Sequence, residues 1–242
     1  MKIAIYLLTA APLLAGDLER FTDSKLNQTQ RTEACLALRG VKTAEVVTAM
    51  RAALEDMRVQ ACAASNLRIA GADKQLLEAL QDNNAMVRAV AARELGTMEK
   101  REYIDALRKA AQDKDLLVQT NAMEGLVRYR DRSSAPVLRE IALLGGILTS
   151  MALDQLIQWN DEAVPQIARK LVTRQEPGDL LAGIRALGIA GDASDLPRLK
   201  ELASTDELAG AGGRGFGLMP AVSISKAAQT ALARIGQRAA KS

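Results

Sequence analysis

The sequence predicts an all-α fold in which about six to seven helical hairpins stack into a solenoid. Two observations lead to this prediction: one pattern of apolar and small residues recurs along the chain, and the composition suits closely packed helices. Hydrophobic residues make up 48% of the 242 residues, whereas aromatic residues make up only 2%. A chain with many alanines and few strand-forming residues favours helices packed against helices.

The recurring pattern is clearest in DNNAMVRAVAARELG, residues 82–96. Its apolar residues share one face of a helix of 3.6 residues per turn. Asn83 or Asn84 can cap the start of this helix and Gly96 can end it. Leucines equivalent to Leu95 follow one another at intervals of 28 to 31 residues, with a last interval of 45 residues, and each has a small residue four positions before it. The equivalent leucines are Leu38, Leu67, Leu126, Leu156, Leu187 and Leu232.

Between these leucines lies a second helical pattern, seen for example in QLLEALQD from Gln75 and in VPQIARKLV from Val164. Each unit is therefore two helices joined by a short polar turn. Pro136, Pro165 and Pro197 fall in the first turn of this other helix, where a missing N–H costs least. Because a unit of about thirty residues cannot bury its apolar face alone, the units must stack.

Three segments resemble HEAT repeats of the short bacterial variety related to phycobilin-lyase HEAT-like repeats: LQDNNAMVRAVAARELG, AVPQIARKLV and ALGIAGDASDLPRLKEL. The resemblance covers roughly residues 30–236 and implies a right-handed α-α superhelix of the HEAT/armadillo type. Asp82 and Arg88 match the aspartate and arginine with which such repeats often tie their turns together. Because Asp113 precedes Gln119 instead of an arginine, a continuous Asp–Arg ladder is not expected.

The N-terminal segment MKIAIYLLTAAPLLAG has the layout of a secretory signal peptide: Lys2, then an apolar run from Ile3 to Leu14, then small residues. The run is short for a permanent membrane span. We therefore expect a signal peptide at residues 1–16, cleaved near residues 15–16, a solenoid over residues 17–242, and a periplasmic or secreted protein. The alternative is that this segment forms a buried first helix of the solenoid.

Cys35 and Cys62 are the only cysteines of the chain, and they fall on second helices of neighbouring units. Oxidising compartments retain disulfides, so an exported protein with an even number of cysteines can carry a bridge here. The alternative is that the two are small core residues that never meet.

Several classes of catalytic and ligand site have no counterpart in the sequence. The chain contains no histidine, so it has no His-based triad, no HExxH helix and no imidazole metal ligand. GAGGRG, residues 210–215, matches the dinucleotide fingerprint letter by letter, but it follows a helical pattern where that motif requires a strand. The sequence therefore predicts no enzyme, no catalytic residues, no cofactor and no metal.

The last interval between repeat leucines exceeds the others by about fifteen residues, so residues 206–220 form a Gly-rich loop inserted between the two helices of the last unit. Phe216, Leu218 and Met219 make its far end apolar. A surface loop without a binding role is one interpretation. The other two interpretations are that the loop contacts a partner or that it covers the core of the last repeat.

Stacked units offer an extended curved surface that suits the binding of another protein. We expect a scaffold or adaptor that binds a protein partner through its concave face, with Arg88, Arg93 and Gln119 among the contacts, and through the Gly-rich loop. Nucleic-acid binding, as in HEAT-like alkylpurine DNA glycosylases, is the alternative, although acidic residues interrupt this face and aromatic stacking groups are nearly absent. A lyase-type accessory subunit is a further alternative that rests on the resemblance alone. The oligomeric state stays open.

Overall fold

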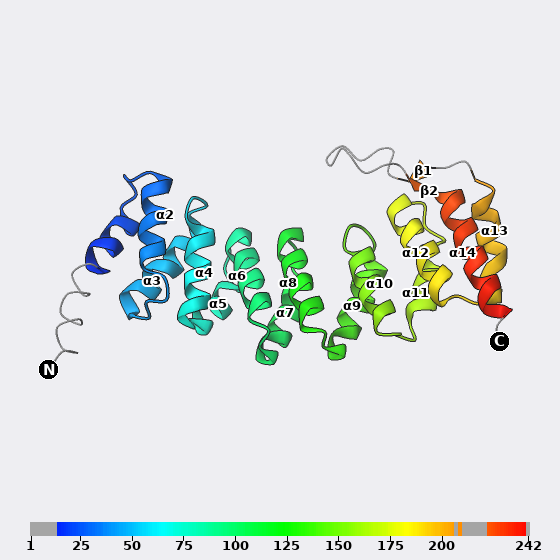
Figure 1. Ribbon diagram of the computed structural model, residues 1–242, viewed down its shortest axis with the longest axis horizontal. Helices are drawn as coiled ribbons and strands as arrows, with labels where there is room; N and C mark the ends of the chain where they lie inside the picture. The colour runs from blue at the N-terminus through cyan, green and yellow to red at the C-terminus, as the bar shows by residue number, and fades with distance from the viewer. Residues whose placement is uncertain (1–13, 206–207, 210–221, 241–242) are drawn as a thin grey trace. The chain divides into compact units, whose positions relative to one another are not determined.

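The computed structural model describes residues 14–205, 208–209 and 222–240 of the chain. The expected signal peptide at residues 1–16 therefore lies almost wholly outside the described residues. The chain divides into two compact units, Met1–Asp131 and Arg132–Ser242. Each unit is a stack of helical hairpins, so the predicted all-α fold is confirmed (Figure 1).

The first unit begins with a helix that includes residues 14–22. The second helices of its hairpins pack side by side in the order α2, α4, α6 and α8, and the shorter first helices α3, α5 and α7 lie against them (Figure 1). The elements are α2 (Gln28–Ala37), α3 (Ala44–Ala52), η1 (Ala53–Glu55), α4 (Gln60–Ala70), α5 (Asp73–Ala79), α6 (Ala85–Met98), η2 (Arg101–Tyr103), α7 (Ile104–Ala110) and α8 (Leu116–Tyr129).

The second unit repeats the arrangement, with α10, α12 and α14 as second helices and α9, α11 and α13 as first helices. Its helices are η3 (Arg132–Ser134), α9 (Ala135–Leu144), α10 (Thr149–Gln158), α11 (Val164–Leu171), α12 (Pro177–Ala190), η4 (Ala193–Asp195), α13 (Leu196–Ala203) and α14 (Ile224–Ala239). Two short strands, β1 (Leu208–Ala209) and β2 (Val222–Ser223), pair antiparallel between α13 and α14. The sequence did not predict this pair, which joins the two ends of the inserted segment.

The repeat leucines form the core of both units. Leu38, Leu67, Leu95, Leu126 and Leu156 are completely buried, and Leu187 is 1% exposed. The small residues four positions before them are buried as well. Each hairpin thus buries the stripe that the sequence pattern marks, against its own first helix and the next second helix.

The last repeat departs from this pattern, because α14 buries Ala231 whereas Leu232 is partly exposed. The buried residues of α14 are Ile224, Ala228, Ala231 and Ile235. Ala231 faces α12 closely, since a methyl group added to Gly188 would lie 3.1 Å from the Cα of Ala231.

Helix α6 also runs past the residue expected to end it, since Gly96 lies inside the helix and α6 continues to Met98. A methyl group on Gly96 would lie 2.8 Å from the Cα of Gly125 in α8. This glycine therefore allows two helices to touch. The helix ends instead at Glu99, which has a left-handed backbone with φ of 52°.

Cys35 in α2 and Cys62 in α4 are joined by a disulfide. The side-chain amide of Asn66 donates a hydrogen bond of 2.7 Å to the carbonyl oxygen of Cys35, so a buried polar contact reinforces the same pair of helices. The bridge connects the second helices of two neighbouring hairpins. Among the residues that the structure describes, no helix is both long enough and apolar enough to cross a bilayer.

Candidate interaction surface

The turns that lead into the second helices of the first unit are held by one repeated side-chain position. This position lies seven residues before each repeat leucine and carries arginine and glutamine in alternation. Every one of these side chains donates a hydrogen bond to a backbone carbonyl in the segment before its own helix. The donors and acceptors are Arg31 to Phe21, Gln60 to Leu54, Arg88 to Asp82 and Asn83, and Gln119 to Asp113.

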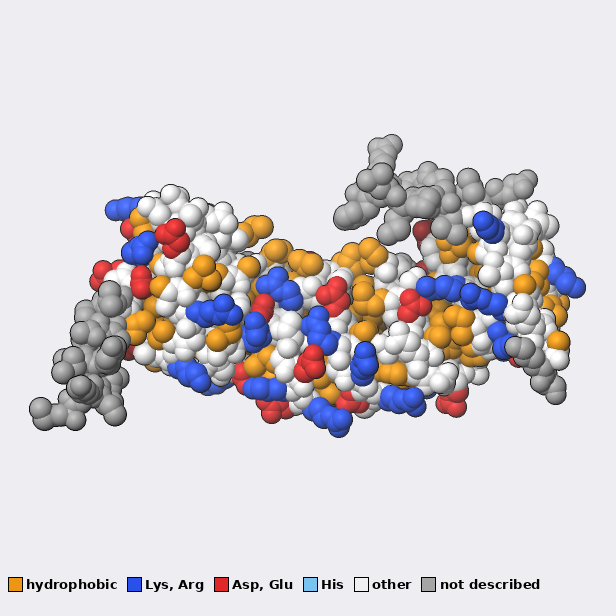
Figure 2. Space-filling view, in the orientation of Figure 1, with side chains coloured by type: hydrophobic (Ala, Val, Ile, Leu, Met, Phe, Trp, Pro, Cys, Tyr) orange, Lys and Arg blue, Asp and Glu red, His pale blue; other side chains and the backbone are white. Residues whose placement is uncertain are grey.

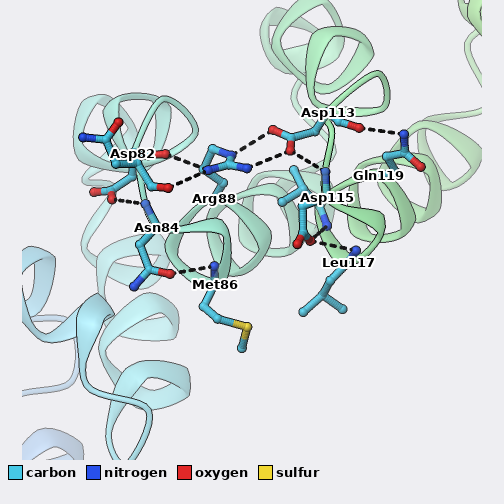
Figure 3. A network of polar contacts seen from close by, with 10 residues as sticks. Asp82, Asn84, Met86, Arg88, Asp113, Asp115, Leu117 and Gln119 are labelled. Atoms are coloured by element: carbon cyan, nitrogen blue, oxygen red, sulfur yellow. Dashed lines mark hydrogen bonds and ion pairs between the residues drawn. The ribbon is translucent and has the colours of Figure 1, made fainter.

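The arginines of this series also reach the next turn. Nε and Nη2 of Arg88 donate to the two carboxylate oxygens of Asp113 at 2.8 and 2.7 Å, while Nη1 holds the carbonyls of its own turn (Figure 3). Arg31 reaches Asp56 with a single bond from Nη1, while its Nε holds the carbonyl of Phe21. Gln60 and Gln119 have shorter, uncharged side chains, and among the described residues each binds only the carbonyl of its own turn. Arginine–aspartate pairs from this position therefore occur at alternate turns, consistent with the interrupted ladder that the sequence indicates.

The charges in this network shift the pKa values of the aspartates. The hydrogen bond from Arg88 lowers the pKa of Asp113 below its ordinary value. A hydrogen bond of 2.7 Å from Arg51 in α3 lowers the pKa of Asp82 in the same way. Both carboxylates are therefore ionised at neutral pH and already neutralised by an arginine.

The structure separates the three residues expected on the concave face. Arg88 is only 7% exposed, and Gln119 is held by its bond to the preceding turn, so both have structural contacts. Arg93 is exposed on α6 and lies 3.1 Å from Glu94, which also accepts a bond from Arg68. Arg93 thus stays a candidate contact residue. The expected loop contacts Phe216, Leu218 and Met219 lie outside the described residues.

The same turns expose a row of large apolar side chains that the sequence reasoning missed. Met57, Met86, Leu116 and Leu117 lie nine or ten residues before a repeat leucine, just before α4 or in the first turn of α6 or α8. Met57 is 74% exposed and Leu117 is 44% exposed. Figure 3 shows Met86 and Leu117 on the same side of the Arg88 network, and Figure 2 shows hydrophobic side chains along this edge of α6 and α8. We call these four residues the apolar row.

A hollow of about 400 Å³ lies beside the Arg88–Asp113 pair. The ends of α5 and α7 and the two following turns form it, and its lining residues are Leu80, Gln81, Asp82, Asn83, Arg88, Lys109, Ala110, Asp113 and Lys114. Its lining holds three cationic and two anionic side chains, a net charge of +1. The apolar row and the hollow together form the turn edge, as we call this part of the first unit.

The second unit ties its turns with arginines from its first helices. Arg139 in α9 forms a two-bond pair with Asp161, at 2.9 and 2.8 Å. Arg169 in α11 donates to Asp195 at 2.7 Å, and this hydrogen bond raises the pKa of the arginine above its ordinary value. These pairs hold the turns that enter the first helices α11 and α13. Among the described residues, no cluster of acidic, cysteine or histidine side chains is arranged to hold a metal ion.

Comparison with solved structures finds distant similarity over nearly the whole chain. The chain is similar to human deoxyhypusine hydroxylase in complex with glycerol, with 17% identity, a TM-score of 0.39, and coverage of 97% of this chain and 99% of that chain. It is also similar to an engineered protein, with 18% identity, a TM-score of 0.33, and coverage of 93% and 96%. Likenesses this distant assign no substrate or site residue. No curated protein matches the chain.

One prediction from the sequence is corrected by this comparison. The missing histidines and motifs led to the prediction that the chain is no enzyme. Deoxyhypusine hydroxylase is an enzyme, and its structure is among those to which the chain is similar. The general exclusion of enzymes is therefore wrong, because one architecture hosts many functions.

The family model of HEAT repeats matches residues 73–145, from the first residue of α5 to the residue after α9. The match contains Arg88, Asp113 and the hollow between them. Of the two residues that match HEAT turns, Arg88 ties its turn to the next one through the carboxylate of Asp113, whereas Asp82 offers Arg88 only its backbone carbonyl and pairs through its carboxylate with Arg51. The resemblance is confirmed, and residues 73–145 carry HEAT repeats within a helical scaffold.

Proposed function

We propose that the chain is an exported scaffold that binds another protein through the turn edge of its first unit. The observation that carries the proposal is the apolar row, because exposed large apolar side chains recur at two adjacent repeat positions on consecutive turns. Contiguous apolar surface on a folded protein marks an interaction site more often than scattered single residues do. Arg93 on the neighbouring helix face and the segment 206–220 are further proposed contact regions.

The turns that present the apolar row are held in place before any partner binds. Arg88 joins two of them, and Asn84 and Asp115 cap the helices that carry Met86 and Leu117, at 3.0 and 2.9 Å. A surface held in this way loses little conformational entropy on binding. The contacts of Arg88, Asn84 and Asp115 thus support a binding role while they stabilise the fold.

Two observations support export. The segment 1–16 has the charge and hydropathy layout of a signal peptide. The disulfide between Cys35 and Cys62 suits an oxidising compartment, because thiols in the cytosol are kept reduced. Sequencing the N-terminus of the protein from envelope and cytoplasmic fractions of its native host tests this part. We expect a chain that starts near residue 16 in the envelope, and an intact Met1 confined to the cytoplasm would contradict export.

Affinity capture from the envelope fraction tests the binding role. The double variant Leu116→Ser/Leu117→Ser removes two exposed apolar groups from the turn edge without touching the core. The matched control is Ile189→Ser, which removes an exposed apolar group from α12 in the second unit. We expect one protein to be retained by the wild type and the control and lost by the double variant. Equal retention by all three chains, or retention of nucleic acid alone, would contradict the proposal.

A further inference from the structure

We infer that the turn edge recognises an extended acidic and apolar segment of its partner, with carboxylates against Lys109 and Lys114 and apolar side chains against Met86 and Leu117. This inference rests on the proposed protein-binding function and specifies the chemistry of the partner. It follows from the charges of the hollow, from the apolar row beside it, and from the ion pairs in which Asp113 and Asp82 are already bound to Arg88 and Arg51.

The two lysines carry the charge argument. Lys109, near the end of α7, and Lys114, in the turn before α8, are both exposed and line the hollow. Neither forms an ion pair with a described carboxylate, although Lys114 lies near enough to Asp113 to contribute to its lowered pKa. Two exposed lysines that line one hollow, neither of them in an ion pair with a described residue, favour an anionic group there.

The acidic groups of the hollow do not offset these lysines. The carboxylate of Asp113 accepts two bonds from Arg88, and that of Asp82 accepts from Arg51. The lining carries three cationic and two anionic side chains, a net charge of +1. A basic segment would therefore be repelled, whereas a carboxylate would replace water at the lysines.

The apolar contacts lie on second helices, Leu117 in the same hairpin as the two lysines and Met86 in the hairpin before it. Lys109 and Lys114 belong to the end of α7 and the turn after it, whereas Met86 and Leu117 belong to the first turns of α6 and α8. The Arg88–Asp113 pair links the turns before α6 and α8, and Met86 and Leu117 lie on one side of it (Figure 3). A segment with both acidic and apolar side chains can therefore satisfy both sets when it lies along the turn edge.

Nucleic acid fits this surface less well than such a segment does. Phosphates would satisfy Lys109 and Lys114, but the neighbouring exposed groups are aliphatic side chains, and bases stack on aromatic rings. Both signs of charge also occur together on the face shown in Figure 2, with Asp and Glu among Lys and Arg over α6 and α8. A protein segment therefore accounts for the lysines and the apolar row together.

Fluorescence anisotropy with the full chain tests the inference. The probe is a fluorescein-labelled peptide that repeats Asp-Leu-Ser, compared with peptides that repeat Lys-Leu-Ser and Asp-Ser-Ser. We expect only the first peptide to saturate, with an affinity that falls as salt rises. Reversing both lysines in Lys109→Glu/Lys114→Glu should weaken binding about tenfold or more, because two attractive contacts become repulsive.

A matched control separates local recognition from general electrostatics. Lys74→Glu changes one exposed charge on α5, where Lys74 is 82% exposed and outside the hollow. This change should alter the affinity by less than about twofold. Loss of binding in Met86→Ser/Leu117→Ser would support the apolar part of the inference. Equal binding of all three peptides, or equal losses in Lys74→Glu and the double lysine variant, would overturn the inference.

Failure of this inference is distinguishable from failure of the proposed function. A partner that is lost from Leu116→Ser/Leu117→Ser but retained by Lys109→Glu/Lys114→Glu would keep the scaffold function and overturn the acidic specificity. A self-association that disappears in Leu117→Ser, measured by sedimentation velocity, would identify a second copy of this chain as the occupant and would also overturn the inference. Saturable binding of the Asp-Leu-Ser peptide with loss in both double variants would establish it.

Discussion

The contact between α6 and α8 depends on two glycines, and replacing Gly96 by alanine tests how tightly the first unit is packed. The new Cβ would lie 2.8 Å from the Cα of Gly125, and the reciprocal Cβ on Gly125 would lie 2.9 Å from the Cα of Gly96. Non-bonded carbons prefer a separation of about 3.5 Å or more, so the helices would have to move apart by about 0.7 Å. The obstructing atom belongs to the backbone, so no side-chain rotation relieves the contact.

Two opposing effects set the expected magnitude. Overpacking of a core costs about 1–3 kcal/mol, and a backbone obstacle places Gly96→Ala at the upper end of this range. Alanine inside a helix is about 1 kcal/mol more favourable than glycine. We therefore expect Gly96→Ala to lower the free energy of unfolding of the first unit by about 2 kcal/mol. The double variant Gly96→Ala/Gly125→Ala should lose less stability than the sum of the losses in the two single variants, since one displacement of the helices accommodates both methyl groups.

Gly236→Ala is the matched control. Gly236 lies inside α14, is exposed, and a methyl group there would meet no atom within 4 Å. The same substitution should therefore raise stability by about 1 kcal/mol. Urea denaturation followed by circular dichroism measures the effects, and hydrogen exchange of the α6 and α8 amides assigns the loss to the first unit. A Gly96→Ala chain that is as stable as the wild type would refute the close contact.

Four further predictions concern the turns and the bridge, each measured by the unfolding free energy of the first unit. Arg88→Ala should cost about 3–5 kcal/mol, because it leaves a carboxylate and two carbonyls unpaired, and a loss below about 1 kcal/mol would contradict this role. Because the pKa of Asp113 is lowered in the folded protein, its contribution to stability is present above the ordinary pKa of 3.8 and is lost as pH falls through the folded pKa. Asp113→Asn should flatten this acid dependence, and an unchanged slope would contradict the assignment. Reduction of Cys35–Cys62 should cost about 3 kcal/mol, whereas an unchanged denaturation midpoint would show that the bridge does not constrain the unfolded chain. Glu99→Gly should stabilise by about 1 kcal/mol because its φ is 52°, and destabilisation would refute the left-handed cap.

Much of the fold could be predicted because each hairpin buries a short local pattern. A leucine with a small residue four positions before it places two helices in contact, so the spacing of Leu95 and Ala91 already marks the buried stripe. Gly96 shows the limit of such reasoning, since a glycine after the stripe can end a helix or admit a neighbouring helix. Only the position of Gly125 in the next unit decides between the two. The partial exposure of Leu232 in α14 and the pairing of β1 with β2 depend on tertiary neighbours in the same way.

The candidate surface could be predicted only in part. Arg88 looks like a surface residue in the sequence because it lies off the apolar stripe, but a neighbouring turn covers it and supplies Asp113 as its partner. Met86 and Leu117 could have been found by comparing positions nine residues before each repeat leucine, where apolar side chains recur outside the stripe. The hollow at Lys109 has no such signal, because residues from two separate turns enclose it.

Site-specific photo-crosslinking in the native host tests the central claim, protein binding at the turn edge, most directly. A photo-reactive amino acid replaces Leu117 in one chain and Lys74, on the exposed side of α5, in a second chain. The account predicts one discrete protein adduct from position 117 that is absent from position 74. Adducts of equal yield from both positions, or none from position 117 in any fraction, would contradict it.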